Sequence, residues 1–165
     1  MVNIAAYRLV IQGVFLYVIS CEDSICPDCG GELTVRSRRE RMLIESDGAR
    51  SIYLIRRLYC GRCRCIHHEL PDFMVPYKRH CAETIEKAIN SEPDAPLDDR
   101  AISRLKQWWG AVSPYFMSIL KSLAEKLDIT FNPAPAFKAI VRAAVNSGNW
   151  IFARAICTRS ESLSG

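Results

Sequence analysis

Two pairs of cysteines constrain this chain more than any other feature of its sequence. The segments 26–30, Cys-Pro-Asp-Cys-Gly, and 60–63, Cys-Gly-Arg-Cys, are Cys-x-x-Cys motifs separated by enough residues for a β-hairpin. Each motif can place two thiolates on one tight turn, and a hairpin between the motifs brings the four thiolates around a tetrahedral ion. This spacing is typical of a zinc ribbon. We therefore expect a structural zinc ion bound by Cys26, Cys29, Cys60 and Cys63.

The residues after the second motif leave one ligand open. Cys65, His67 and His68 follow Cys63 closely, and any of them can replace a member of the second pair. We favour Cys63, because Cys65 lies on the opposite face of an extended chain or beyond the turn. We expect both histidines at the surface or in phosphate contacts. The other cysteines have no partner spacing and are expected to be buried small side chains: Cys21, Cys81 and Cys157.

The cysteine pattern also bears on the compartment. A thioredoxin-like motif is a single Cys-x-x-Cys that opens a helix, which two motifs around a hairpin do not provide. Thiolates that bind zinc indicate a reducing, cytoplasmic location. The apolar stretch from Leu9 to Ile19 resembles a signal peptide, but only Arg8 precedes it and it is shorter than the roughly 18 residues of a membrane span. We interpret 14–19 as a strand and expect no membrane association.

The remaining elements follow from turn signals and periodicity. Asp47-Gly48 between strand-forming runs predicts a hairpin of 42–45 with 51–59. From Tyr77, apolar residues recur every three or four positions, which predicts a helix to about Asn90. A second helix is expected after Asp98 or Asp99, a third from Ser113-Pro114 and a fourth over 135–147. The predicted fold class is α+β, with a small zinc-ribbon β unit (1–76) followed by an α-helical, helix-turn-helix-like unit (77–165).

Positive charge is confined to one segment. Nine arginines and three acids lie between residues 34 and 66, a net charge of +6, so the rest of the chain carries −2 of the overall +4. The positive electrostatic potential of this segment attracts a polyanion. Guanidinium groups also bind phosphates through paired hydrogen bonds. A solvated charged face is the alternative. The predicted phosphate contacts are Arg36, Arg38, Arg39, Arg41, Arg56, Arg57, Arg62 and Arg64.

The second predicted helix offers another possible contact with nucleic acid. With its apolar stripe turned inward, its outer face carries donors and acceptors suited to base edges: Arg100, Ser103, Arg104 and Gln107. The plain surface of a helical bundle is the alternative. The aromatic residues at helical spacing are expected in the core, with Trp108 directed away from Trp109.

Several segments together resemble a known group of proteins. They are Cys26-Pro27-Asp28-Cys29-Gly30-Gly31, 55–63, 68–73 with Pro76-Tyr77, 102–109, and 141–150 with 158–160. Over most of residues 26–160 the chain resembles a poorly characterised bacterial family of zinc-ribbon plus helix-turn-helix proteins, encoded in insertion sequences and other mobile elements, often beside a transposase. The resemblance implies DNA binding in transposition or its regulation, with Cys26, Cys29, Cys60 and Cys63 as the metal set.

These observations predict a zinc-stabilised accessory or regulatory protein of a mobile element. Its expected partner is DNA, most simply a duplex, with a transposase or recombinase as a further partner. The alternative is an adaptor that docks on a transposase or polymerase. An enzyme is not expected, because metal-dependent strand transfer needs convergent carboxylates. The acids here are scattered or stand at helix starts, as Asp98 and Asp99 do.

Overall fold

The computed structural model describes residues 1–128, 130 and 136–150, which form a mixed α+β structure in two compact units. The first unit is Met1–Thr84 and contains all the strands; the second begins at Ile85. The division therefore falls eight residues after the one expected from the change in composition. Several residues considered above lie outside the described part: position 135 at the start of the predicted fourth helix, Cys157 and 158–160.

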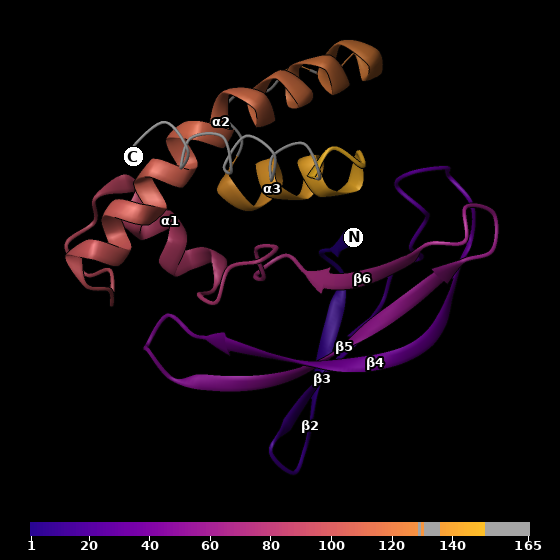
Figure 1. Ribbon diagram of the computed structural model, residues 1–165, viewed down its shortest axis with the longest axis horizontal. Helices are drawn as coiled ribbons and strands as arrows, with labels where there is room; N and C mark the ends of the chain where they lie inside the picture. Colours follow the sequence, from indigo (N-terminus) through magenta and orange to yellow (C-terminus); the bar gives the residue numbers. More distant parts are fainter. Residues whose placement is uncertain (129, 131–135, 151–165) are drawn as a thin grey trace, which may run out of the picture. The chain divides into compact units, whose positions relative to one another are not determined.

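The first unit is a curled six-stranded sheet (Figure 1). Its strands, in chain order, are β1 (Val2–Ile4), β2 (Tyr7–Gln12), β3 (Phe15–Ser20), β4 (Leu33–Ile44), β5 (Arg50–Cys60) and β6 (Ile66–Pro71). The order across the sheet is β1-β6-β5-β3-β2, with β4 paired to β5 outside this path.

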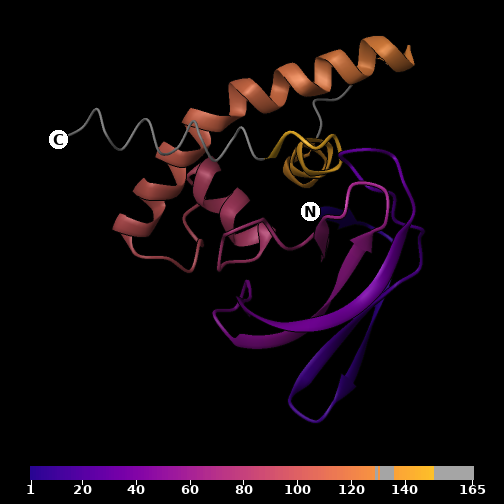
Figure 2. The ribbon, with the colours of Figure 1, turned by 45° about the vertical axis from the view of Figure 1, so that its right-hand side comes forward.

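Strand β5 is the centre of the sheet because both of its edges are paired. One edge carries β4, antiparallel along almost its whole length. The other edge is shared: β3 runs parallel to it at Ile52–Leu54, and β6 runs antiparallel to it at Arg57–Tyr59. The turned view shows β4 and β5 as one long curved ribbon (Figure 2). This ribbon joins the two cysteine motifs, because β4 follows the first and β5 ends in the second.

The predicted hairpin is confirmed and is longer than expected. Its turn holds Gly48 at a φ of +84°, and the amide of Ala49 donates to the Asp47 carboxylate at 2.9 Å. Glycine suits this position because it has no Cβ to clash at positive φ. At the other end of the hairpin the register shifts between Val35 and Ser37, so Arg36 is an extra residue in a β-bulge.

The apolar segment near the amino terminus forms a second hairpin, so its interpretation as a strand is confirmed. Strands β2 and β3 pair from Tyr7–Ser20 to Gln12–Phe15. β2 lies at the end of the sheet order, and the hairpin extends away from the other strands in both views (Figures 1 and 2). Its turn leaves Ile11 and Val14 about three-quarters exposed, at 74% and 75%.

A single apolar cluster holds the first unit together. It draws on distant parts of the sequence: Val2, Ile4, Val18, Leu43, Tyr53, Ile55, Leu70, Met74 and Cys81. The rings of Tyr7 and Tyr53 each pack on Phe73, with centroids 5.5 and 5.2 Å apart. The expectation that Cys81 is buried is confirmed, whereas Cys21 is exposed, contrary to prediction.

The first helix begins later than its periodicity predicts. α1 spans Ala82–Asn90, and Tyr77 stands outside it, exposed and at a φ of +61°. The residues before α1 give their backbone groups to the sheet instead. The amide of Ile44 donates to Arg79, and the amide of Cys81 donates to Ile44. Pairing with β4 therefore replaces the first helical turns that apolar spacing alone would allow.

The second unit contains two further helices, α2 (Asp99–Leu127) and α3 (Phe137–Asn146). α2 begins as predicted, with the Asp98 carboxylate accepting from the amide of Ala101 at 2.7 Å. The predicted break at Ser113-Pro114 is wrong, because Pro114 lies inside this one helix. The buried stripe of α2 continues past Pro114 from Val112 to Phe116, and we attribute the uninterrupted helix to this packing.

Aromatic packing forms the core of the second unit. The Trp109 ring meets the Phe137 ring edge-on, with centroids 5.1 Å apart, and Phe116 stacks on Trp150 at the same distance. These contacts confirm the expectation that the aromatic residues at helical spacing belong to the core. Trp108 is half-buried beside Trp109, at 5.9 Å between centroids. No helix within the described residues is both long enough and apolar enough to span a membrane.

Candidate metal centre and arginine face

The two cysteine motifs form turns of the same construction. The amide of Cys26 donates to the carbonyl of Gly31, and the amide of Cys60 donates to the carbonyl of Cys65, each closing over the same number of residues. The residue after the second cysteine is left-handed in both turns, with φ +69° at Gly30 and +59° at Arg64. Such turns direct two sulfur atoms and several backbone amides towards one point.

The four sulfur atoms converge as the spacing predicts. Cys26 and Cys63 lie 3.6 Å apart between sulfurs, and Cys29 and Cys60 lie 3.5 Å apart. All four sulfurs lie within 4.8 Å of one another. Sulfurs bound to one tetrahedral zinc ion are about 3.8 Å apart, given Zn–S bonds of about 2.3 Å. The cluster could therefore hold a metal ion, and Cys63 belongs to it whereas the exposed Cys65 does not.

The surroundings of the cluster favour ionised sulfur at Cys60, whereas burial and hydrogen bonds to neighbouring sulfurs outweigh backbone amides at Cys29 and Cys63 and raise the pKa of those two thiols. The backbone N–H of Cys63 points to the Cys60 sulfur and lowers the pKa of that thiol to about 7. The Arg62 guanidinium donates to the carbonyl of Cys29 at 3.1 Å, which ties the two turns together. A Cβ added at Gly31 would lie 3.2 to 3.4 Å from Arg62 and from the sulfurs of Cys60 and Cys29. A side chain at position 31 would therefore crowd the metal centre, because the two turns approach each other closely.

Two further metal-binding side chains lie beside the sulfurs. Contrary to the expectation of a surface position, His67 is buried, and its Nε2 lies 3.4 Å from the Cys26 sulfur. The Asp28 carboxylate lies 3.9 Å from the same ring nitrogen. Burial lowers the pKa of His67, so the neutral imidazole is favoured. Asp28 is missing from the sequence prediction although it stands inside the first motif, between the two cysteines.

His68 does not fit the role of a positively charged phosphate contact. Burial and the neighbouring positive charges of Arg39 and Arg57 lower its pKa to about 4. It is therefore neutral at physiological pH, which corrects the expectation for this residue. His68 pairs with Arg57 across β5 and β6, so the two side chains share a face of the sheet.

The arginines of the hairpin separate into two faces, because paired residues of neighbouring strands point to the same side. Ser37 pairs with Arg57 and Arg39 pairs with Ile55, so Arg39 and Arg57 share a face. The Arg36 guanidinium lies over the Tyr59 ring at 5.6 Å, and Tyr59 is two residues from Arg57 on β5. We call Arg36, Arg39 and Arg57 the arginine face. The paired positions from Thr34 to Arg41 place no acid on this face.

Three predicted phosphate contacts are engaged within the protein instead. Arg41 donates from one nitrogen to the carbonyls of Val75 and Lys78, both at 3.0 Å, and its burial lowers its pKa. Arg62 braces the cysteine turns. Arg56 forms a two-fold ion pair with Glu69, with both N–O distances 2.6 Å, and the Glu69 side chain is only 1% exposed. These side chains stabilise the unit, and Arg41 and Arg56 are not free for phosphates.

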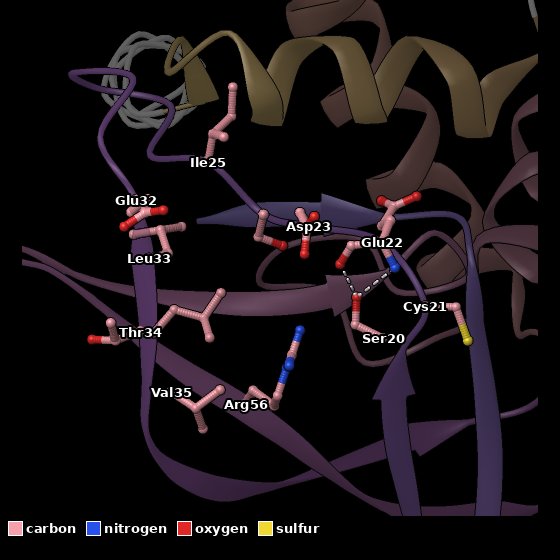
Figure 3. A pocket seen from close by; sticks show the side chains of 12 residues that line it. Ser20, Cys21, Glu22, Asp23, Ile25, Glu32, Leu33, Thr34, Val35 and Arg56 are labelled. Carbon is pink, nitrogen blue, oxygen red and sulfur yellow. Dashed lines mark hydrogen bonds between the residues drawn. The ribbon is translucent and has the colours of Figure 1, made fainter.

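An open pocket of about 810 Å³ surrounds Arg56 on the opposite side from the arginine face (Figure 3). Three acids line it: Glu22, Asp23 and Glu32. Ser24 adds a hydrogen bond to the Glu69 carboxylate at 2.8 Å. Glu69 gives no signal in the sequence, because nothing in its spacing marks a partner for Arg56. The acidic lining distinguishes this side of the hairpin from the arginine face.

The candidate recognition residues lie on the exposed surface of α2. All four are solvent-exposed in its first turns: Arg100, Ser103, Arg104 and Gln107. A helix-turn-helix is not confirmed. The connection from Asn90 to Asp99 is longer than a tight turn, and α2 runs on through Pro114 to Leu127. The role of these four residues therefore remains a prediction.

The fold and the site define a class, namely an α+β protein with a four-cysteine centre at the end of a long hairpin. A family model described as a domain of unknown function, DUF6431, matches residues 26–108. The match covers about half of the chain, and the chain belongs to the DUF6431 family. It runs from the first cysteine turn to Trp108 in α2. No curated protein and no solved structure matches the chain.

The family gives no function to this chain. Its description does not mention zinc, a helix-turn-helix or transposition. The comparison therefore shows membership of this family and none of the functions that the resemblance to proteins of mobile elements implies. Those functions are proposals.

Proposed function

We propose that this protein is a zinc-stabilised DNA-binding accessory or regulatory protein of a mobile genetic element. The observation that carries the proposal is the arginine face, an acid-free group of guanidinium groups beside the four-cysteine centre. Arg36 and Arg39 are exposed and Arg57 is half-buried. Spaced guanidinium groups on one side of a sheet can bind successive phosphates of a nucleic-acid backbone.

Zinc is the metal that best suits this centre. A closed set of four thiolates with sulfur separations of 3.5 and 3.6 Å is typical of structural zinc. The ion would hold Cys29 of the first turn against Cys60 at the end of β5. We therefore expect the metal to fix the end of the hairpin that carries Arg36 and Arg57, and DNA binding to depend on it.

The outer surface of α2 supplies the candidate base contacts. Arg100, Arg104 and Gln107 are exposed and suit guanine and adenine edges in a major groove. On this proposal, the arginine face gives affinity without sequence preference and α2 gives the preference. A transposase or recombinase as further partner rests on the resemblance alone.

Binding to a duplex DNA pool over a salt series tests the proposal. The logarithm of the binding constant should fall steeply with the logarithm of salt. A variant with Arg36, Arg39 and Arg57 changed to glutamine should lose about 2.7 of that slope, at about 0.9 for each phosphate contact. Arg50→Gln is the control and should keep the wild-type slope, because Arg50 is exposed at the opposite end of β5 and is not a predicted phosphate contact. An equal slope in the triple variant and wild type would contradict the proposal.

One observation favours the alternative role of an adaptor. The β2–β3 hairpin presents Leu9, Val10, Ile11 and Val14 to solvent, and β2 is paired on one side only. An exposed apolar strand at a sheet edge can receive a strand from a partner protein. If the triple variant retains its salt slope while Ile11→Asp abolishes binding to a purified transposase, the adaptor is the better account.

A further inference from the structure

Two sets of metal-binding side chains meet at the cysteine turns, and they share two members. The first set is the four cysteines. The second consists of Cys26, Asp28, Cys63 and His67, whose ligand atoms also lie within 4.8 Å of one another. Cys26 and Cys63 belong to both sets. Two four-membered groups that share an edge are the arrangement needed for two ions bridged by two thiolates.

The distances in the second set fit a tetrahedral ion. The shared edge between the sulfurs of Cys26 and Cys63 is 3.6 Å, and the edge from the Cys26 sulfur to Nε2 of His67 is 3.4 Å. Zinc bonds of about 2.3 Å to sulfur and 2.0 to 2.1 Å to nitrogen give edges of about 3.8 and 3.5 Å. The carboxylate of Asp28 lies 3.9 Å from Nε2 and within 4.8 Å of both sulfurs.

The fold holds the histidine in place for this role. Backbone pairing of β6 with β5 sets His67 opposite Leu58 and buries its ring beside the cysteines. Nδ1 of the ring lies 3.2 Å from the amino group of Met1, so Nε2 is the nitrogen directed to the sulfurs. Asp28 is exposed, which leaves a path for an ion to enter.

We propose that the centre is binuclear, with a second zinc ion bound by Asp28 and His67 and bridged to the first by the thiolates of Cys26 and Cys63. Charge supports two ions. One divalent ion leaves the four thiolates with excess negative charge, and the Asp28 carboxylate adds to it. A second divalent ion offsets most of this excess in a partly buried site.

The two ions should differ in affinity. The first ion is bound by four thiolates. The second is bound by the two bridging thiolates, a histidine and an exposed carboxylate. We therefore expect a chelator to remove the Asp28–His67 ion first and the four-cysteine ion afterwards. This proposal rests on the zinc centre proposed above and is independent of DNA binding.

Native mass spectrometry of the full chain, loaded with zinc and freed of excess metal, tests the proposal. We expect two ions per chain in the wild type and one in His67→Ala. His68→Ala is the matched control, because His68 adjoins His67 but belongs to neither set, and it should retain two ions. One ion in the wild type overturns the binuclear centre and leaves the four-cysteine site standing. No bound ion overturns both, so the two failures are distinguishable.

Cadmium-113 NMR of the cadmium-loaded chain gives an independent measurement. Two resonances are expected, one at the shift of four sulfur ligands and one shifted by the nitrogen and oxygen ligands. His67→Ala should remove only the second resonance. Should the wild type give a single resonance that moves in His67→Ala, His67 binds the same ion as the cysteines and the proposal is wrong. The wild-type spectrum decides even if a variant fails to fold.

Discussion

The two units of this protein are held together by different means. In the first, contacts join residues far apart in the sequence, as where Cys26 meets Cys63 and β1 pairs with β6. In the second, the longest element is a helix with local hydrogen bonds, and an aromatic cluster around Phe116 fills the core. Long-range pairing has a larger loop-closure cost than local helical contacts.

The comparison gives a reason why the candidate metal centre lies in the first unit, whereas the described part of the second unit contains none. The apolar cluster of the first unit lies around Val18, Leu43 and Ile55, whereas the cysteines stand at the far end of the β4–β5 hairpin. That end carries exposed arginines, and its apolar side chains Ile25, Val35 and Ile66 are left exposed. An ion that binds four side chains at once can fix such an end where packing cannot. The second unit has buried aromatic rings for the same purpose.

Removing the metal should have the largest effect, and this effect should be confined to the first unit. Structural zinc contributes on the order of 10 kcal/mol of binding free energy in small zinc domains. We expect a chelator to expose the amides around both cysteine turns to hydrogen exchange while those of α2 stay protected. Hydrogen exchange with mass spectrometry measures both regions in one sample. Simultaneous loss of protection in α2 would break the comparison.

Phe116→Ala should give the converse result. Phe116 is fully buried and packs on Trp109 and Trp150, so its truncation should cost about 3 to 5 kcal/mol of stability in the second unit. Helical circular dichroism should melt at a lower temperature, while the zinc content of the chain stays unchanged. Met117→Ala, at an exposed position next in sequence, is the control. Loss of zinc together with loss of helical structure would show that the stabilities of the two units are coupled.

Gly31→Ala should have the smallest effect and should sharpen the account of the metal centre. The new Cβ would meet two cysteine sulfurs and Arg62, and sulfurs held by an ion cannot move away easily. We expect a cost of about 1 to 2 kcal/mol, seen as weaker zinc binding in competition with a chromogenic chelator. Gly61→Ala lies in the same pair of turns but meets nothing within 4 Å, and it should bind zinc like the wild type.

The parts of the fold that sequence reasoning predicted are those with local signals. The cysteine turns follow from fixed spacing and the hairpin follows from Asp47-Gly48, because both features are decided within a few residues. The start of α2 follows from Asp98 in the same way. The convergence of the four sulfurs could also be predicted, because a hairpin between the two motifs brings its two ends, and so the two cysteine turns, together.

The parts that were missed depend on contacts between distant residues. Nothing near Pro114 indicates that α2 continues, because the decision rests on the packing of Val112 and Phe116 in the core. The burial of His67 follows from the pairing of β6 with β5, and the partner of Arg56 is set by the same pairing. The side of the sheet that Arg36 takes could not be predicted, since it depends on a bulge that no residue type marks.

The bulge at Arg36 changes which face of the sheet the odd-numbered and even-numbered residues of β4 occupy. Side chains along a strand change sides at every residue, so one additional residue reverses the order for everything before it. Leu33 and Val35 thereby face the pocket, together with Leu58, the partner of Val35, while Arg39 and Arg41 keep the opposite side. Val35 and Ser37 nevertheless pair with the adjacent residues Leu58 and Arg57 of β5. Deletion of Arg36 would therefore leave an uninterrupted ladder, in which the metal end and the arginine face keep their present sides and the local bend of the bulge is lost.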